Sequence, residues 1–473
     1  MNGQDTLPYQ KVYQEDVEYF EKIVSAKNIL LPQQEKYENY LSDHTEDYVF
    51  YPEIVLKPHS AEQISQILSY CNEKHIPVTP RGAGTGLSGG SLCVCGGVCL
   101  SVENLNRIIE IDTLNFQAVV EPGVITQVFQ EAVIEKGLFY PPDPSSRGSC
   151  FMGGNIAHNS GGPRAVKYGV VKDYILGLEV VLANGSIIQT GAKTLKNATG
   201  YNLTALIIGS EGTLGVVTKI FVKLIPYPKF RLCMLVPFYE EIAACNAVAS
   251  IFRINITPSA LEFMEYDAIT WGQKYTGIQL FDDPHIRAHL LIEVDGNELE
   301  SLYQDCEKIY KVLEAYPIGE VLFADSTDAQ ANLWKLRRSI GEAVKQNSIY
   351  KEEDTVVPRA HLGKLLQGVK EIGKRYGFRS ICYGHAGDGN LHVNIVKENM
   401  PDKMWKETIP QAIREIFHLC KQLGGTISGE HGVGYVQRPY LDIVFDPVQI
   451  DIMKQIKKIF DPNGILNPQK IFV

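Results

Sequence analysis

The spacing of apolar residues predicts where helices and strands lie along the chain. Apolar positions recur every three or four residues in segments 8–27 and 60–75, which indicates amphipathic helices, and Ser60 is a typical helix N-cap. From about residue 50 to 225 the pattern changes to short apolar runs bounded by Gly and Pro, which indicates strands. The predicted strands cover 76–80, 96–102, 116–123, 175–185 and 215–225.

A second region begins after the turn-like Pro226–Lys229. Amphipathic helices at 240–252 and 302–316 alternate there with strands such as 289–296, and a last helix is expected over 448–462. The pattern therefore predicts an α+β protein in three parts. We expect a first domain over 1–225, a second α+β domain over 226–420 and a C-terminal segment over 421–473.

Composition and charge narrow the class of protein. The 473 residues are 45% hydrophobic and 21% charged, which is typical of a globular chain. A net charge of −10 and the lack of basic runs argue against a nucleic-acid surface. The N-terminus is polar and acidic, unlike a secretory signal, and no apolar run approaches the length of a membrane span. We expect a cytoplasmic location, with peripheral contact at a membrane left open.

The ten cysteines are expected to be reduced thiols. Cys93, Cys95 and Cys99 lie close together in the sequence, but the C-x-x-C pairs typical of an iron-sulfur site are missing. Their spacing fits a buried strand around Gly96-Gly97, and we therefore predict strand structure over 91–102.

Three glycine-dense stretches lie in the first domain, at 80–91, 141–169 and 209–220. Glycines let several backbone N–H groups point into one concavity, which suits a pyrophosphate. The first stretch is not a Rossmann fingerprint, because more glycine and a strand follow it, and no P-loop motif occurs in the chain. Three such loops indicate a long ligand that approaches the backbone at several points.

These motifs resemble a known family. The segments 80–90, 142–146, 153–157 and 209–215, with Gly161-Gly162, are similar to the FAD-binding domain of oxidoreductases related to vanillyl-alcohol oxidase. The nearest resemblance is to the D-2-hydroxyacid dehydrogenase branch, which includes the glycolate oxidase flavoprotein subunit, D-lactate dehydrogenase and D-2-hydroxyglutarate dehydrogenase. It extends over roughly residues 45–473 and implies a two-part FAD-binding domain, a substrate-binding cap and a C-terminal helical segment that returns to the flavin.

The resemblance also implies which residues contact the cofactor. The expected FAD contacts are Pro80, Arg81, Gly82, Ala83, Gly84, Thr85, Gly86, Ser88, Pro122, Gly123, Pro142, Asp143, Ser146, Gly153, Gly154, Asn155, Ala157, Asn159, Ser160, Gly161, Glu211, Gly215, Val216 and Val217. No histidine lies in 80–91, and Cys93 and Cys95 are assigned to the following strand, so we expect FAD to be bound non-covalently.

Two histidines, His385 and His392, flank a glycine-rich segment in CYGHAGDGNLHVN. Two imidazoles and a carboxylate suit a divalent cation with open positions for a chelating substrate. Glu430 in Gly-Glu-His-Gly is the expected third ligand, and His431 beside it is the expected base. The family motifs H-A-G-D-G-N-L-H and G-E-H-G fall on these positions. A lone histidine is usually structural, but this set favours a metal site for zinc, manganese or iron.

Several neighbouring residues are assigned with alternatives. Asp388 is another possible ligand, and Asn390 and Asn394 are expected to orient groups around the site. Asn394 is also included among the expected substrate contacts.

The resemblance places a substrate-binding arginine at Arg337, after Trp334, while Arg338 stands where relatives often carry Glu. Either arginine is a candidate to bind the substrate carboxylate, and Lys345 and Lys351 are further cations. Gln469 replaces a glycine usual in the family.

The expected activity is oxidation of a D-2-hydroxy acid, with D-lactate or glycolate favoured, to the 2-oxo acid. The cation acidifies the hydroxyl, His431 takes its proton and the α-hydrogen passes as hydride to the flavin. Electrons then go to an external acceptor: an electron-transfer flavoprotein, an iron-sulfur subunit or a quinone. The alternatives are a D-2-hydroxyglutarate dehydrogenase, a metal-dependent hydrolase and a non-catalytic FAD subunit. A homodimer is left open.

Overall fold

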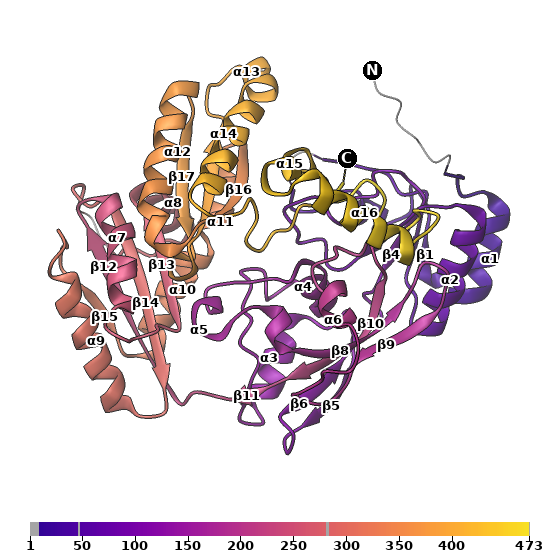
Figure 1. Ribbon diagram of the computed structural model, residues 1–473, viewed down its shortest axis with the longest axis horizontal. Coiled ribbons are helices and arrows are strands. Elements are labelled where there is room, and N and C mark those ends of the chain that lie inside the picture. The colour runs from indigo at the N-terminus through magenta and orange to yellow at the C-terminus, as the bar shows by residue number, and fades with distance from the viewer. Residues whose placement is uncertain (1–8, 46–47, 281–282, 473) are drawn as a thin grey trace.

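The computed structural model describes residues 9–45, 48–280 and 283–472. Figure 1 shows two bodies, one built from the first half of the chain and the other from the orange and pink segments, with the yellow C-terminal segment lying against the first. The predicted α+β class is confirmed, since helices cover sheets in both bodies. Residue 8, where the first predicted helix begins, lies outside the described residues.

A four-stranded sheet opens the first body. Its order is β1(Ile29–Leu30), β2(Ile54–Leu56), β4(Val98–Ser101) and β3(Val78–Arg81), and β2, β4 and β3 are parallel. Helices α1(Gln14–Val24) and α2(Ala61–Lys74) share a hydrophobic core with these strands. The predicted N-cap is confirmed, because the side chain of Ser60 accepts a hydrogen bond from the Gln63 backbone N–H.

An antiparallel five-stranded sheet completes this body. Its order is β5(Ile108–Asp112), β6(Gln117–Val120), β10(Val216–Lys223), β8(Ile175–Val181) and β9(Ile187–Gly191). Burial alternates along β10, as the sequence pattern predicts for a sheet with one covered face. Helices α3(Thr126–Ile134), α4(Met152–His158) and α6(Leu203–Ile207) contribute to the core of this sheet. Of the three glycine-dense stretches, 80–91 runs from the end of β3 towards β4, 141–169 contains α4 and α5(Ala165–Tyr168), and 209–220 leads into β10.

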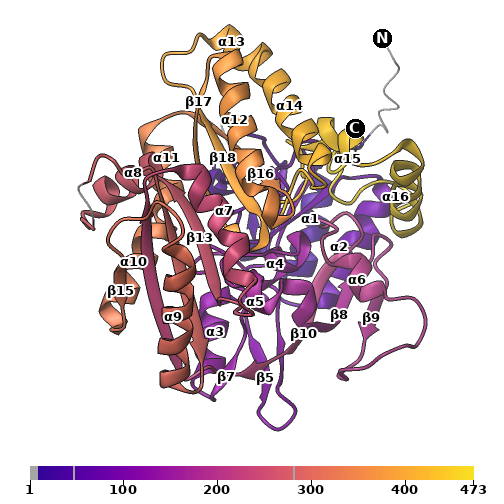
Figure 2. The same cartoon turned by 60° about the vertical axis from the view of Figure 1, so that its left-hand side comes forward.

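The second body is a seven-stranded antiparallel sheet. Its order is β15(Leu322–Ala324), β12(Phe230–Phe238), β14(Ala288–Gly296), β13(Ala260–Glu265), β17(Arg379–Gly384), β18(Asn390–Val396) and β16(Tyr350–Val356). Helices α7(Glu241–Phe252), α9(Leu299–Leu313), α12(Leu362–Tyr376) and α14(Ile409–Gln422) share the larger core, on one face of the sheet. Figure 2 shows α7, α9 and α12 over that face. Helices α8(Tyr266–Thr276), α10(Thr327–Arg338) and α11(Ile340–Asn347) pack on the other face.

The C-terminal segment joins the two bodies. Thr426 pairs with Val356 of the seven-stranded sheet, and after α16(Pro447–Phe460) Leu466 pairs with Val78 of the first body. The buried side chain of Asn467 donates hydrogen bonds to two backbone carbonyls, those of Gly90 and Glu211. The chain therefore returns to the glycine-dense loops, as the resemblance implies.

The strand predicted over 91–102 is only half correct. Val98–Ser101 form β4, but residues 91–97 form turns, with backbone hydrogen bonds from Val94 to Leu92 and from Gly96 to Cys93. Gly96 and Gly97 both have positive φ, and a Cβ at Gly97 would lie 2.3 Å from the carbonyl of Pro77. The glycine pair therefore ends the turn and starts the strand at Val98. In the part of the chain that the structure describes, no helix has the length and apolar character needed to cross a bilayer.

Candidate active site

A β-hairpin brings His385 and His392 together. His385 directly follows β17 and His392 lies on β18, and the turn between them contains Gly389 at φ +84°. A side chain at Gly389 would place its Cβ 1.9 Å from the carbonyl of Val357, so the turn requires glycine. The glycine-rich segment thus folds back tightly and leaves two buried imidazoles at one end of the hairpin.

Glu430 lies between these two imidazoles. Its Oε1 atom is 3.2 Å from His385 Nε2 and 3.5 Å from His392 Nε2. The imidazole rings stand 5.3 Å apart at 86° to one another, so their in-plane lone pairs can converge on one point. Donor atoms of the three residues all lie within 4.8 Å of one another, which fits a single divalent cation.

A second group of possible ligands overlaps the first. In the described part of the chain, Glu352, His392 and His431 also bring donor atoms within 4.8 Å. The His392 and His431 rings, however, are stacked at 10° with centroids 5.2 Å apart. In the first group, the Nε2 atoms of His385 and His392 lie 3.2 and 3.5 Å from the same Glu430 oxygen, whereas His431 Nε2 lies 4.0 Å from it. The geometry therefore favours the group formed by His385, His392 and Glu430.

Asp354 holds the loop that carries Glu430 and His431. Its Oδ2 atom accepts hydrogen bonds from the backbone N–H groups of Gly429, Glu430 and His431 at 2.7, 2.8 and 2.9 Å, and from the Ser428 hydroxyl. Burial alone would raise the pKa of this carboxyl, but His431, His392 and the backbone donors hold it below its ordinary value. An ionised Asp354 therefore fixes the position of the loop.

The buried charges of the site shift one another's pKa values. Burial opposes ionisation of Glu430, yet the three surrounding imidazoles keep its pKa well below the usual range. Burial, assisted by His431, lowers the pKa of His392 to about 3, so this imidazole is neutral at neutral pH. For His431, burial lowers the pKa, but Asp354, Glu352 and Glu430 outweigh it and raise the pKa above its ordinary value. Burial raises the pKa of Glu352.

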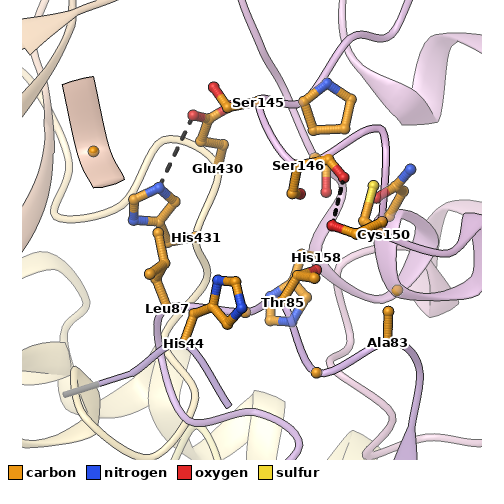
Figure 3. Close-up of a pocket in the computed structure, with 18 of the residues that line it drawn as sticks. His44, Ala83, Thr85, Leu87, Ser145, Ser146, Cys150, His158, Glu430 and His431 are labelled. Carbon is orange, nitrogen blue, oxygen red and sulfur yellow. Dashed lines mark hydrogen bonds and ion pairs between the residues drawn. The ribbon is translucent and has the colours of Figure 1, made fainter. Parts of the chain in front are cut away.

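A cavity of about 330 Å³ opens beside this cluster. Glu352, His392, Glu430 and His431 form part of its wall, and the glycine loop 82–86 forms another part. Figure 3 shows Glu430 and His431 on one side and Ser146, Cys150 and His158 on the other. A second cavity of about 90 Å³ adjoins it, and the two share four wall residues: Gly82, Ser91, Gly154 and His158. Together they form an elongated space between the glycine-dense loops.

Most of the residues predicted to contact FAD line this space. Those on the two cavity walls are Pro80, Arg81, Gly82, Ala83, Gly84, Thr85, Gly86, Pro122, Ser146, Gly153, Gly154, Asn155, Ala157, Ser160, Glu211, Gly215, Val216 and Val217. Gly154 faces open space, because a Cβ added there would meet nothing among the described residues within 4 Å. Backbone exposed to an elongated space fits a dinucleotide such as FAD.

Two predicted cofactor residues direct their side chains elsewhere. The Arg81 guanidinium donates to the backbone carbonyls of Asn39 and Ser42, so this side chain anchors the N-terminal segment. Glu211 accepts hydrogen bonds from the backbone N–H groups of Val433 and Gly434, at 2.8 and 2.7 Å. Glu211 therefore joins the third glycine-dense loop to the segment that carries His431.

The remaining predicted FAD contacts lie off the cavity walls: Ser88, Gly123, Pro142, Asp143, Asn159 and Gly161. Several of them support neighbouring loops instead. The Ser88 hydroxyl donates to the His431 carbonyl at 2.9 Å, and the Pro142 carbonyl accepts from Gln130 at 2.8 Å. A Cβ at Gly161 would lie 3.0 Å from Glu430 Oε2, so this glycine makes room for the carboxylate.

Comparisons with known proteins identify the family. Residues 227–471 match the model for the C-terminal domain of FAD linked oxidases, and residues 52–191 match an FAD binding domain. The chain belongs to the FAD-linked oxidases. It is 43% identical over 437 residues to glycolate oxidase subunit GlcD of Bacillus subtilis (strain 168), covering 92% of each chain. It is also 38% identical over 471 residues to a D-lactate dehydrogenase of Anaerostipes hadrus, covering 98% of each.

The fold of this FAD-linked oxidase also matches a solved structure. The 4-ethylphenol oxidase from Gulosibacter chungangensis, in an isoeugenol complex, aligns with a TM-score of 0.74 at 18% identity over 98% of each chain. This likeness confirms the predicted vanillyl-alcohol oxidase type of fold. The family match also confirms that the chain is a flavoprotein oxidoreductase that binds FAD.

Both candidate arginines of this FAD-linked oxidase line the larger cavity, together with Lys345. Arg337 lies 2.7 Å from Glu262 and over the ring of Tyr383, and Arg338 lies 2.9 Å from Asp143 across the boundary between the two bodies. Asn394 is fully buried within β18, off the cavity walls, and donates to the Ile381 carbonyl.

Sequence reasoning missed four residues around the site: Glu262, Glu352, Asp354 and Tyr383. A signal for Glu352 and Asp354 is present in the run Lys351-Glu-Glu-Asp-Thr355, because acidic residues that are buried on a strand need charged or hydrogen-bonding partners. Asp354 pairs directly with His392 across the sheet, a relationship that requires the strand register. Glu262 has no local signal, since apolar residues flank it on both sides within the buried strand β13.

Proposed function

We propose that this FAD-linked oxidase oxidises a D-2-hydroxy acid to the 2-oxo acid with the help of a divalent cation. D-Lactate and glycolate are the favoured substrates, and an external acceptor removes the electrons. One observation carries the proposal: the donor atoms of His385, His392 and Glu430 converge, and two of these residues, His392 and Glu430, line the glycine-lined cavity.

The relatives support the substrate class. Two similar proteins are a glycolate oxidase subunit and a D-lactate dehydrogenase, and the chain covers nearly the whole length of both. Glycolate and lactate each place a hydroxyl beside a single carboxylate. A cation held by two imidazoles and one carboxylate keeps positions open for such a chelating pair.

The cation site is assigned to His385 Nε2, His392 Nε2 and Glu430 Oε1. Mixed nitrogen and oxygen donors suit zinc, manganese or iron(II). When bound, FAD supplies a hydride acceptor and the cation lowers the pKa of a coordinated hydroxyl by several units. The residues of the chain then have three tasks: to orient the substrate, to accept its proton and to exclude water.

His431 is the proposed proton acceptor. It lies on the cavity wall beside Glu430, with its Nε2 atom 4.0 Å from Glu430 Oε1. Asp354 holds its backbone in place, and only the neutral imidazole can accept a proton. Activity is therefore expected to rise with pH as His431 loses its own proton.

Arg337 or Arg338 is proposed to bind the substrate carboxylate, since both line the cavity. Charge-assisted hydrogen bonds from a guanidinium to a carboxylate are among the stronger polar contacts in proteins. Lys345 and Arg338 in the same wall favour D-2-hydroxyglutarate as a second candidate, because they offer cations for a second carboxylate. A non-catalytic FAD subunit would not need the three proposed cation ligands or the proposed base His431. Because the chain has all four residues, that alternative is the weaker proposal.

We also propose an electron acceptor, a cellular location and a domain division for this enzyme. The external acceptor is an electron-transfer flavoprotein, an iron-sulfur subunit or a quinone, and the location is the cytoplasm. The chain is proposed to work as three parts, 1–225, 226–420 and 421–473, with the third completing the active site through Glu430 and His431.

Anaerobic flavin bleaching tests the activity. The yellow holoenzyme is mixed without oxygen with D-lactate, glycolate or D-2-hydroxyglutarate, and flavin absorbance is followed. One of these acids is expected to bleach the flavin, whereas L-lactate is expected to bleach it far more slowly. His431→Ala is expected to keep the flavin bound but to lose rapid bleaching. Full-rate bleaching in that variant would remove His431 from its role.

A further inference from the structure

Glu262 is a fully buried carboxylate outside both groups of possible metal ligands. It lies on β13 in the interior of the seven-stranded sheet, with none of its surface exposed. A buried carboxylate is costly unless charged or hydrogen-bonding partners compensate its lost hydration. Glu262 has two such partners, His385 and Arg337, and each of them has a proposed task in the active site.

The first partner is the imidazole of His385. Its Nδ1 atom lies 2.9 Å from Glu262 Oε2, while its Nε2 atom faces Glu430 at 3.2 Å. The two carboxylates therefore lie on opposite sides of one ring. With Nδ1–H donating to Glu262, the lone pair of Nε2 is left for a cation beside Glu430. Glu262 thus selects the tautomer of His385 that can bind a metal.

The second partner is Arg337. Its Nη2 atom lies 2.7 Å from Glu262 Oε2, and its guanidinium also lies over the ring of Tyr383, 5.0 Å from the centroid. Arg337 is 3% exposed and lines the larger cavity. The carboxylate and the aromatic ring together hold the guanidinium against the cavity wall, where a substrate carboxylate would meet it.

We propose that Glu262 is a positioning residue that orients the cation ligand His385 and the substrate-binding Arg337 at the same time. This inference rests on the proposed function, because it assigns roles to a cation and to a substrate carboxylate. It predicts that one substitution at Glu262 weakens cation binding and substrate binding together. A glutamate that merely neutralised a buried charge would leave both unchanged once the protein had folded.

Zinc affinity is the first readout. The FAD-loaded protein is stripped of metal with a chelator and titrated with Zn²⁺ against a chromogenic zinc indicator. Glu262→Gln keeps the shape but loses the charge, and its zinc affinity is expected to fall by about 10- to 100-fold. Glu293→Gln is the matched control, because Glu293 is a buried glutamate on the neighbouring strand β14 that contacts Trp334 and Arg164 instead of His385. Its zinc affinity is expected to equal that of the wild type.

The Michaelis constant is the second readout. At saturating Zn²⁺, Glu262→Gln is expected to raise the KM for D-lactate several-fold more than it lowers kcat, because a misplaced Arg337 weakens binding of the carboxylate before and during the reaction. Glu293→Gln is expected to leave KM unchanged. Flavin absorbance and thermal unfolding show whether each variant is folded.

Glu262→Asp keeps the test decisive if Glu262→Gln does not fold. The aspartate retains the charge but withdraws the carboxylate by about 1.5 Å, one C–C bond. It is expected to weaken zinc binding several-fold. Wild-type zinc affinity in the folded Glu262 variants would overturn the proposal for Glu262, while loss of zinc in Glu430→Gln would show that the cation site itself stands. Failure of the wild-type protein to bind either Zn²⁺ or Mn²⁺ would overturn both proposals.

Discussion

Asp354 and Glu430 lie 76 residues apart in the chain, yet Asp354 Oδ2 accepts a hydrogen bond from the Glu430 backbone N–H at 2.8 Å. The same oxygen accepts from Gly429, His431 and the Ser428 hydroxyl. One strand residue thereby fixes the loop that supplies both the third proposed cation ligand and the proposed base. Contacts within the protein, from Asp354 of the seven-stranded sheet, therefore hold this part of the C-terminal segment in place.

Asp354→Asn is expected to loosen this loop. The neutral amide is a weaker acceptor, and hydrogen bonds to charged groups contribute about 1.5–3 kcal/mol each. Zinc affinity and kcat/KM are both expected to fall by about 100-fold, while the flavin stays bound because the glycine-dense loops are unchanged. Ser428→Ala removes one donor of the four and is expected to have a much smaller effect. Equal losses in the two variants would contradict the anchoring role of Asp354.

Gly154 tests the position of the cofactor. A side chain there would meet nothing among the described residues within 4 Å and would project into the space shared by both cavities. The series Gly154→Ala, Gly154→Val and Gly154→Leu is expected to fold normally but to lose FAD progressively. The ratio of flavin absorbance to protein absorbance measures this loss. Full flavin content in folded Gly154→Leu would place the cofactor elsewhere.

Much of this fold and site follows from sequence pattern. Alternating burial along β10 and the three- to four-residue spacing in α2 follow from the demand that one face of each element be buried. His385, His392, Glu430 and His431 were predicted as one site because their residue types suit one chemistry, and the structure brings them together.

The rest depends on tertiary relationships. Asp354 lies beside His392 because of the strand register, and it contacts Glu430 because the C-terminal segment returns to this sheet. Glu262 contacts His385 from another strand of the same sheet. The local sequence pattern does not encode these relationships. Cysteine and valine in 91–97 favour a strand by pattern, whereas the positive φ of Gly96 and Gly97 is incompatible with strand geometry at those two residues. Gln469 stands where the family usually has glycine and adopts φ +64°, so the turn keeps the conformation that favours glycine.

Asp143 is expected to matter for stability more than for flavin binding. It is buried among Arg147, Arg164 and Arg338, at 3.2, 3.5 and 2.9 Å. Asp143→Asn leaves three guanidinium groups without their shared carboxylate and is expected to cost about 3–5 kcal/mol of unfolding free energy. Glu110→Gln breaks an exposed pair with Lys193 and is expected to cost under about 1 kcal/mol. Thermal unfolding of both variants at neutral pH measures the contrast; similar losses would contradict it.

His289 is expected to contribute to unfolding in acid. Burial lowers its pKa from 6.5 to about 3 in the folded protein. Between these two pH values the unfolded chain binds a proton at this position and the folded chain does not, so stability falls as pH falls from 6.5 towards 3. In His289→Gln the melting temperature is expected to fall less steeply between pH 6.5 and 5. Parallel curves for the two proteins would show that His289 does not titrate in this way.

The most direct test of the account removes the cation alone. The holoenzyme is stripped of metal with a chelator under conditions that retain FAD, and its anaerobic bleaching by D-lactate or glycolate is followed in a stopped-flow instrument before and after metal is returned. Bleaching is expected to slow by at least about 100-fold without the cation, in line with the several kcal/mol that a bound cation supplies, and to recover with Zn²⁺, Mn²⁺ or Fe²⁺. His385→Ala is expected to show no such recovery. Unchanged bleaching in the stripped, flavin-loaded protein would contradict the account.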